Sequence, residues 1–169
     1  MKLKFLLLLT LLLLQPAVFG QKKLVAKEIS FEFLAKGVDG TLGGFSSESV
    51  VYTDDLTKSV FKGSVQVTTL KTGNFLRDWS LKGRKYFDED NFPEISFESS
   101  AISVTDKGYQ VEGTLFMKGV SKPLSISFQQ KGDQLIGTAT LNSVDYGITI
   151  LKKKKEDNTV RLKLVFQLQ

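Results

Sequence analysis

The stretch VRLKLVFQL, residues 160–168, decides the fold class of this 169-residue chain. Its apolar residues stand at every second position, and Arg161, Lys163 and Gln167 lie between them. Side chains of a β-strand alternate between two faces, so the pattern predicts a strand with one buried face and one solvated face. Half-buried strands of this kind are typical of antiparallel sheets.

The same period of two recurs along the chain. It predicts further strands at residues 29–33, 61–68, 95–98, 109–117 and 124–129. Short turn-forming sequences follow several of these runs, at residues 106–108, 119–123 and 131–133. No internal repeat or low-complexity linker divides the chain, so we predict one all-β domain made of successive antiparallel hairpins.

One segment departs from the period of two. Between residues 72 and 87, Asn74 is a candidate helix N-cap, and Phe75, Trp79 and Lys82 follow at helical spacing. We therefore predict one short helix, which ends near Gly83 and carries the only tryptophan of the chain.

The first residues have the composition of a targeting segment. Lys2 and Lys4 precede a short leucine-rich run, and the small residue Gly20 follows it. This order is typical of a secretory signal peptide, and the run is too short for a comfortable membrane span. We predict a signal peptide at residues 1–20, a mature domain at residues 21–169 and a periplasmic or secreted protein.

Composition excludes several functions. The chain contains neither His nor Cys, which rules out Ser-His-Asp or Cys-His catalysis, disulfides, and zinc sites of the usual kind. Loss of Lys2 and Lys4 with the signal peptide would lower the net charge by two, from +5 to +3. So small an excess does not favour a nucleic-acid binder.

The inward-facing phase of the strands contains small residues as well as large ones. Gly63, Gly113, Gly137 and Ala139 fall in it. Glycine weakens a strand interior, so it either leaves room for a ligand, forms a bulge, or faces a bulky partner across the core. The same phase has no ionisable side chain, which suits a hydrocarbon ligand but equally suits a solid core.

Two charged features have competing interpretations. Lys152 to Lys155 form a run that either contacts anionic lipid headgroups or, as we favour, lies on a solvated hairpin. Arg77 and Asp78 are adjacent, so on a helix they do not face each other. We expect each to reach the neighbouring loop and to tie the helix to the sheet.

Four stretches, in order, resemble the YceI family of small exported proteins. They are FEF, GV and GGF within residues 31–45, RD to FPEISFES within residues 77–99, VEGTL with KGVSKP within residues 111–123, and DYGI at residues 145–148. The second and third are the most specific, and together the four cover nearly all of residues 21–169. Members often carry a histidine where this chain has Ala35, and another where it has Ser80.

The resemblance implies an eight-stranded, antiparallel, lipocalin-like barrel with one short helix. It also implies that the lumen binds a polyisoprenoid or a similar long-chain apolar lipid, a quinone-like molecule included, with no other cofactor, no metal and no enzyme activity. The side chains expected to line the lumen are Phe31, Phe33, Phe61, Val65, Phe97, Leu115, Met117 and Phe128. Those expected to close one end are Phe75, Trp79, Leu81 and Phe87.

Two other functions stay open from the sequence. The first alternative is an interaction module of the cell envelope, a filled barrel whose loops bind another protein. The second is an enzyme with a tyrosine or carboxylate site, for which Asp145 and Tyr146 are the candidates. A continuous apolar cavity would favour lipid binding over both.

Overall fold

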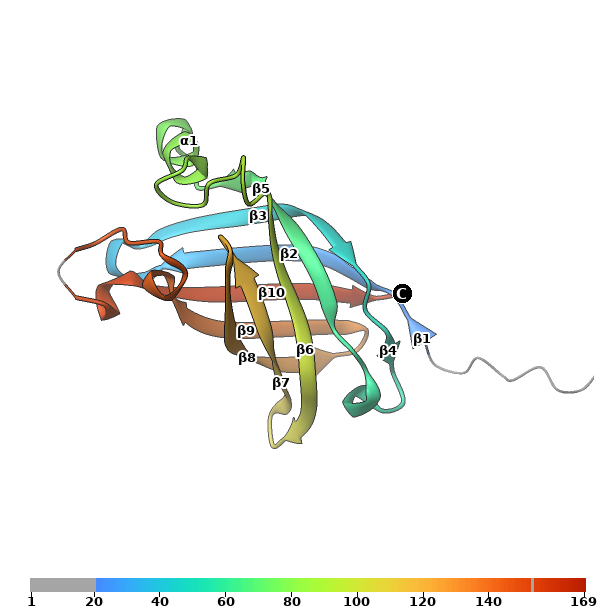
Figure 1. Ribbon diagram of the computed structural model, residues 1–169. Coiled ribbons are helices and arrows are strands. Elements are labelled where there is room, and N and C mark those ends of the chain that lie inside the picture. The colour runs from blue at the N-terminus through green and yellow to red at the C-terminus, as the bar shows by residue number, and fades with distance from the viewer. Residues whose placement is uncertain (1–20, 153) are drawn as a thin grey trace, which may run out of the picture.

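The computed structural model describes residues 21–152 and 154–169, so the signal peptide expected at residues 1–20 lies outside the described residues. Eight strands form a closed barrel in which every neighbouring pair is antiparallel (Figure 1). They are β2 (Leu24–Phe33), β3 (Val38–Ser47), β5 (Lys62–Lys71), β6 (Glu94–Thr105), β7 (Gly108–Met117), β8 (Val120–Lys131), β9 (Gln134–Asn142) and β10 (Thr159–Leu168). The expected eight-stranded antiparallel barrel is confirmed.

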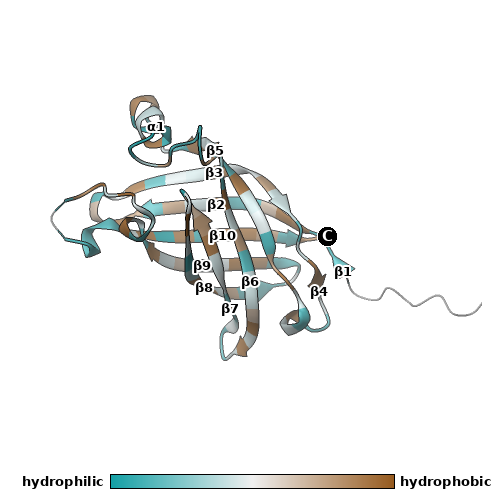
Figure 2. Ribbon diagram, in the orientation of Figure 1, coloured by the Kyte–Doolittle hydropathy of each residue, from teal (hydrophilic) through white to brown (hydrophobic). Residues whose placement is uncertain are grey.

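Chain order is kept around the barrel, and β10 closes it by pairing with β2 and β9. In this pairing Leu162 of β10 lies opposite Phe31 of β2 and Ala139 of β9. On the outer face of the same seam, Arg161 pairs with Glu32 at 2.8 Å. The alternation of residues 160–168 thus has the predicted outcome, with apolar side chains inside and charges outside. Figure 2 shows the alternation itself as bands of hydropathy along the strands.

The single α-helix among the described residues is α1 (Phe75–Lys82), which connects β5 to β6 (Figure 1). Asn74 caps it as predicted, because its side chain accepts a hydrogen bond from the Arg77 amide at 3.0 Å. Short 3₁₀ turns lie at Leu34–Lys36, Leu56–Lys58, Ser143–Tyr146 and Glu156–Asn158. None of the described helices is long and apolar enough to cross a membrane.

The two ends of the barrel differ. One, here the α1 end, carries α1, the β2–β3 and β7–β8 turns and the β9–β10 connection. The other, the terminal end, carries the C-terminus and a two-stranded ribbon of β1 (Gln21–Lys22) and β4 (Val51–Tyr52). Asn158 anchors the β9–β10 connection, since its buried side chain accepts from the Ile150 and Leu151 amides, each at 2.9 Å.

The glycine-rich strand β3, VDGTLGGFSS, does not follow the period of two. Its register with β5 shifts twice, between Thr41 and Gly43 and between Gly43 and Ser46. Gly44 has a φ of +64°, a conformation that favours glycine. These irregularities break the alternation of inward and outward side chains, so a period of two in the sequence does not identify this strand.

Candidate functional site: an apolar cavity in the barrel

The barrel encloses an apolar cavity of about 550 Å³. All eight barrel strands contribute to its wall, and none of the described residues that line it is Asp or Glu. This volume lies in the usual range of small-molecule sites. The site is therefore the interior of the barrel itself rather than a cleft on its surface.

Burial along β10 differs between the two ends of the barrel. Phe166 and Leu168, toward the terminal end, are buried, whereas Val160, Leu162 and Leu164 point inward but are only partly buried. An inward apolar side chain keeps accessible surface only if no other atoms fill the space before it. The hollow therefore occupies the half of the barrel nearer α1.

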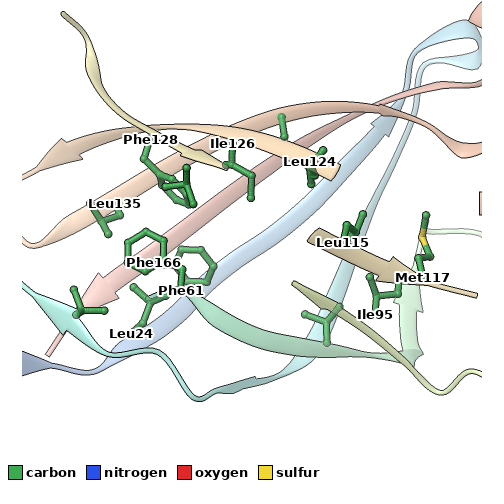
Figure 3. Close-up of a cluster of buried hydrophobic side chains, with 14 of the residues drawn as sticks. Leu24, Phe61, Ile95, Leu115, Met117, Leu124, Ile126, Phe128, Leu135 and Phe166 are labelled. Atoms are coloured by element: carbon green, nitrogen blue, oxygen red, sulfur yellow. The ribbon is translucent and has the colours of Figure 1, made fainter. Parts of the chain in front are cut away.

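A cluster of phenylalanines forms the floor of the hollow. The ring centroids of Phe45 and Phe166 are 5.2 Å apart, those of Phe61 and Phe128 are 5.6 Å apart, and those of Phe128 and Phe166 are 6.3 Å apart. Figure 3 shows Phe61, Phe128 and Phe166 together, with Ile95, Leu115 and Met117 farther along the barrel. Tilted and edge-on ring pairs at these distances are favourable, so the floor is a firm stop for a ligand.

The inward glycines face phenylalanine rings, one of the interpretations left open by the sequence. A Cβ on Gly137 would lie 2.5 Å from the ring of Phe128, and one on Gly113 would lie 2.4 Å from the ring of Phe97. Gly137 and Phe128 are direct partners on β9 and β8. Each ring thus lies over the glycine of a neighbouring strand, where a larger residue would displace it.

Residues of the connections frame the mouth of the cavity. Of the described lining residues only Lys36 and Ser80 are exposed, and both belong to the α1 end. Leu81, Tyr86 and Phe87 line the cavity on the β5–β6 side of that end. Ser143, Ile148 and Ile150 line it from the β9–β10 connection. The mouth therefore opens at the α1 end.

Ten of the twelve residues predicted from the sequence lie in the wall. They are Phe31, Phe33, Phe61, Val65, Leu81, Phe87, Phe97, Leu115, Met117 and Phe128. Phe45 and Phe166 also line the cavity. The alternation of residues 160–168 pointed to Phe166, whereas the irregular register of β3 gives no period-two signal at Phe45. Whether these side chains contact a ligand stays a prediction.

Phe75 and Trp79 are placed differently from expectation. Their side chains are 81% and 72% exposed, and neither lines the cavity. The expected closure of the mouth by these two residues is therefore absent from the structure. The segment between α1 and β6 also has one aromatic side chain in the cavity wall and one outside it. Phe87 lines the cavity, whereas Phe92 covers Gly119 in the β7–β8 turn.

Thr72 determines how α1 is oriented. Arg77 donates from Nε to the Thr72 hydroxyl and from Nη2 to the Thr72 carbonyl, both at 2.7 Å. Asp78 accepts from the Thr72 amide at 2.8 Å and from its hydroxyl, and the hydroxyl hydrogen bond lowers the pKa of the Asp78 carboxyl. Each side chain thus binds the loop, as the sequence predicted, and α1 is fixed to the end of β5.

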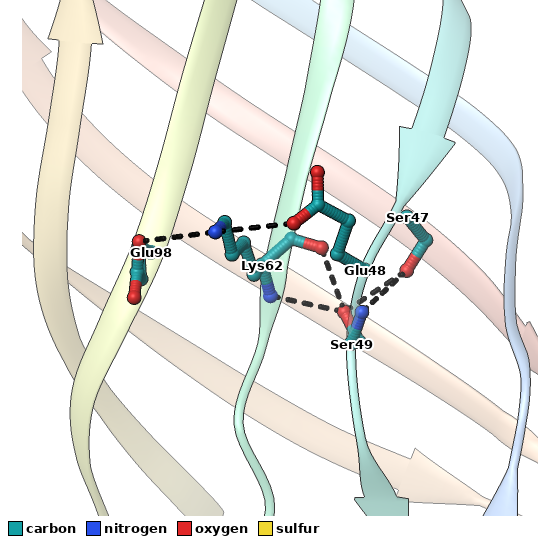
Figure 4. Close-up of polar contacts among 5 residues, drawn as sticks. All are labelled: Ser47, Glu48, Ser49, Lys62 and Glu98. Carbon is teal, nitrogen blue, oxygen red and sulfur yellow. Dashed lines mark hydrogen bonds and ion pairs between the residues drawn. The ribbon is translucent and has the colours of Figure 1, made fainter.

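Lys62 follows the floor residue Phe61 in the chain, and its charge is paired with two exposed carboxylates. Its ammonium lies 3.1 Å from Glu48 and 3.7 Å from Glu98, and the hydrogen bond to Glu48 raises the pKa of Lys62 (Figure 4). Ser49 accepts from the Lys62 amide and donates to its carbonyl, both at 3.0 Å. These contacts hold the irregular β3–β5 seam and pair the Lys62 ammonium with carboxylates.

The residues proposed for an enzymatic alternative do not meet in the cavity. Asp145 forms an ion pair with Lys155 at 2.6 Å. Tyr146 is buried, and burial raises the pKa of its phenol. Neither residue lines the cavity, so the two do not combine with it into one site.

A closed antiparallel barrel of eight strands around an apolar hollow has the lipocalin-like architecture. Residues 23–168 match the family model described as the YceI-like domain. The chain belongs to the YceI family, and the predicted resemblance is confirmed.

The individual relatives align with only part of this chain, at low sequence identity. The chain is 29% identical over 107 residues to a UPF0312 protein of Yersinia pestis (strain Pestoides F), an alignment that covers 62% of this chain and 56% of that protein. A UPF0312 protein of Photorhabdus laumondii is 29% identical over 70 residues, which covers 41% of this chain and 36% of that protein. The chain thus aligns with about half or less of each relative.

Solved structures share the fold at low identity. BcnA of Burkholderia cenocepacia superposes with a TM-score of 0.68 at 19% identity, over 82% of this chain and 94% of that chain. A polyisoprenoid-binding domain from Saccharophagus degradans superposes with a TM-score of 0.57 at 11% identity, over 89% of this chain and 98% of that domain. The family and the fold together suggest a binding role rather than catalysis.

Proposed function

We propose that this protein binds a polyisoprenoid or a similar long-chain apolar lipid in the barrel cavity, without catalysis. The observation that carries the proposal is the hollow half of the barrel, where apolar side chains such as Leu162 and Leu164 point inward without filling the space. An apolar chain gains roughly 25 cal/mol per Å² that it buries, so such a wall binds hydrocarbon without specific polar contacts.

The shape of the cavity supports a ligand with two unlike ends. The floor is built from phenylalanine rings, which suits a hydrocarbon tail. Lys36, Arg77 and Ser80 lie at the mouth, where a polar headgroup would remain near water. The filled-barrel alternative has less support, because it predicts a barrel without a cavity.

The proposal includes export. The amino-terminal sequence supports a signal peptide at residues 1–20, and thus a periplasmic or secreted carrier or store of lipid. Mass measurement of the protein recovered from outside the cytoplasm tests this point. The expected mass is that of residues 21–169. Recovery of the intact chain from the cytoplasm alone would contradict export.

The binding function is tested by extraction. The purified mature protein is extracted with organic solvent, and the extract is analysed by mass spectrometry before and after incubation with a long-chain isoprenoid. We expect a long-chain lipid in stoichiometric amount after incubation. Repeated absence of any such lipid, with no uptake of the added isoprenoid, would contradict the proposal.

A variant that fills the hollow makes the test specific. Leu162→Trp with Leu164→Trp adds two indoles on the inner face of β10, where the wall residues are only partly buried. We expect retained lipid to fall by about tenfold or more while the fold persists, since the added volume enters open space. Lys163→Trp on the outer face of the same strand is the matched control and should bind lipid like the parent.

A further inference from the structure

Three large apolar side chains of α1 are presented to solvent. Phe75 is 81% exposed, Leu76 is 71% exposed and Trp79 is 72% exposed. Because residues three and four positions apart share a side of a helix, these three form one continuous face. Single exposed apolar residues are ordinary, but a contiguous group of this size on one short helix marks an interaction surface.

The helix is held so that this apolar face points away from the barrel. On the opposite side, Arg77 and Leu81 line the cavity mouth. Asn74 caps the helix, and Thr72 accepts hydrogen bonds from Arg77 and donates to Asp78. The exposure of the apolar face is therefore part of the packed arrangement of α1, which stands outside the barrel wall in Figures 1 and 2.

Exposed cations flank α1 in the chain and also lie on the β9–β10 connection. Lys71, Arg84 and Lys85 are exposed next to α1 in the chain. Lys152 and Lys154 are exposed on the β9–β10 connection, which belongs to the same end of the barrel (Figure 1). Asp88, Glu89 and Asp90 follow the helix and oppose part of this charge. Aromatic side chains flanked by lysine and arginine are the composition with which proteins anchor at a membrane interface.

We propose that the apolar face of α1, formed by Phe75, Leu76 and Trp79, docks on a lipid bilayer that contains anionic lipid. Docking there brings the cavity mouth to the membrane surface, where a water-insoluble ligand enters or leaves without crossing water. A bilayer fits this face better than a protein partner does, because its interior accepts the apolar side chains and its headgroups attract the surrounding cations. Three side chains on one eight-residue helix make this docking reversible.

Trp79 reports directly on the docking, because it is the only tryptophan of the chain. The mature protein is mixed with vesicles of phosphatidylethanolamine and phosphatidylglycerol. We expect a blue shift of tryptophan emission, quenching by brominated acyl chains, and flotation of the protein with the vesicles. Vesicles of neutral phosphatidylcholine and high salt should both weaken the binding. No shift and no flotation with anionic vesicles would overturn the proposal.

Substitutions on the apolar face locate the contact. Phe75→Ser with Leu76→Ser keeps the reporter and should reduce vesicle binding by about tenfold or more, because each side chain contributes through burial. Val104→Ser is the matched control, since Val104 is 70% exposed on β6 near the terminal end, and it should leave binding unchanged. Equal binding by the Phe75→Ser, Leu76→Ser variant and the parent would contradict the assignment. Emission that shifts with protein concentration in the absence of lipid would instead identify this face as a contact between two copies of the chain.

The docking goes beyond the proposed lipid binding, and the two fail separately. The Leu162→Trp, Leu164→Trp variant should still float with anionic vesicles, although its cavity is filled. If the parent floats but never takes up an isoprenoid, docking stands and the proposed ligand is wrong. If it takes up an isoprenoid from detergent but does not float, the ligand stands and docking is wrong.

Discussion

At the scale of single residues, the pairing of glycine with phenylalanine keeps the barrel both closed and hollow. Gly137 gives the ring of Phe128 a place on the wall, and Phe128 in turn packs on Phe61 and Phe166 to make the floor. A side chain at Gly137 would push this ring into its neighbours. The ring of Phe128, and not the backbone, thus requires a glycine here. The φ angle of Gly137 is not positive, so the backbone conformation would accept other residues.

Gly137→Ala should lower the free energy of unfolding by about 1–3 kcal/mol, because it overpacks the floor. Phe128→Leu in the same chain should recover part of the loss, so that the double variant is more stable than the sum of the single changes predicts. Urea unfolding of the four proteins measures this coupling. Gly43→Ala is the control, since its Cβ would lie 3.6 Å from Thr69, an ordinary contact, and strictly additive single changes would contradict the pairing.

At the scale of elements, α1 is attached to the barrel by a carboxylate. The hydrogen bond from Thr72 holds the pKa of Asp78 below its ordinary value of 3.8. A carboxyl whose pKa is lowered by folding stabilises the folded state fully above its ordinary pKa and loses that contribution as the pH falls through its folded value. The attachment of α1 should therefore weaken below about pH 4 and remain constant above it.

Asp78→Asn tests the attachment. We expect amide hydrogen exchange in residues 72–82 to increase in the parent as the pH is lowered through this range, after correction for the intrinsic exchange rate. In the Asp78→Asn variant this segment should exchange faster at neutral pH and show little further change on acidification. Glu28 also has a lowered pKa, because Ser30 and Lys163 donate to it, so the signal must be read from α1 and not from global stability.

The elements also show how far the sequence alone predicts the structure. Period two identifies the strands whose inner face is regularly apolar, such as β7, β8 and β10, because alternation in the chain is alternation in space. The same rule fails at β3, where bulges and glycines break the period. It underestimates β6, whose second half is mostly exposed and thus carries little apolar signal.

Most of the residues predicted for the site lie in the cavity wall, whereas Phe75 and Trp79, predicted to close one end, do not, for one physical reason. Residues of regular strands have their direction fixed by the pleat, so ten of the twelve predicted residues lie in the wall. A helix has no such fixed relation to its surroundings, and its apolar side usually faces the core. Here the hydrogen bonds of Arg77 and Asp78 with Thr72 turn α1 the other way, and spacing alone does not reveal such contacts.

At the scale of the molecule, the barrel combines a solid half with a hollow half, and β10 passes through both. Near the terminal end Phe166 is 6% exposed and packs against the rings of Phe45 and Phe128. Near the α1 end Leu162 faces open space. The solid half thus supplies the packing on which the fold depends, which leaves the other half free to stay empty for a ligand.

Truncations along β10 should reveal this division. Phe166→Ala removes a fully packed ring and should lower the free energy of unfolding by about 3–5 kcal/mol. Leu162→Ala removes a side chain that already borders a void, so it should lower the free energy by about 1 kcal/mol, well under the usual loss for a buried leucine. Denaturant unfolding of the lipid-free protein measures both. Losses of similar size would mean that the hollow collapses in solution, whereas a larger effect of Leu162→Ala in the lipid-loaded protein than in the lipid-free one would show the ligand lying against this part of the wall.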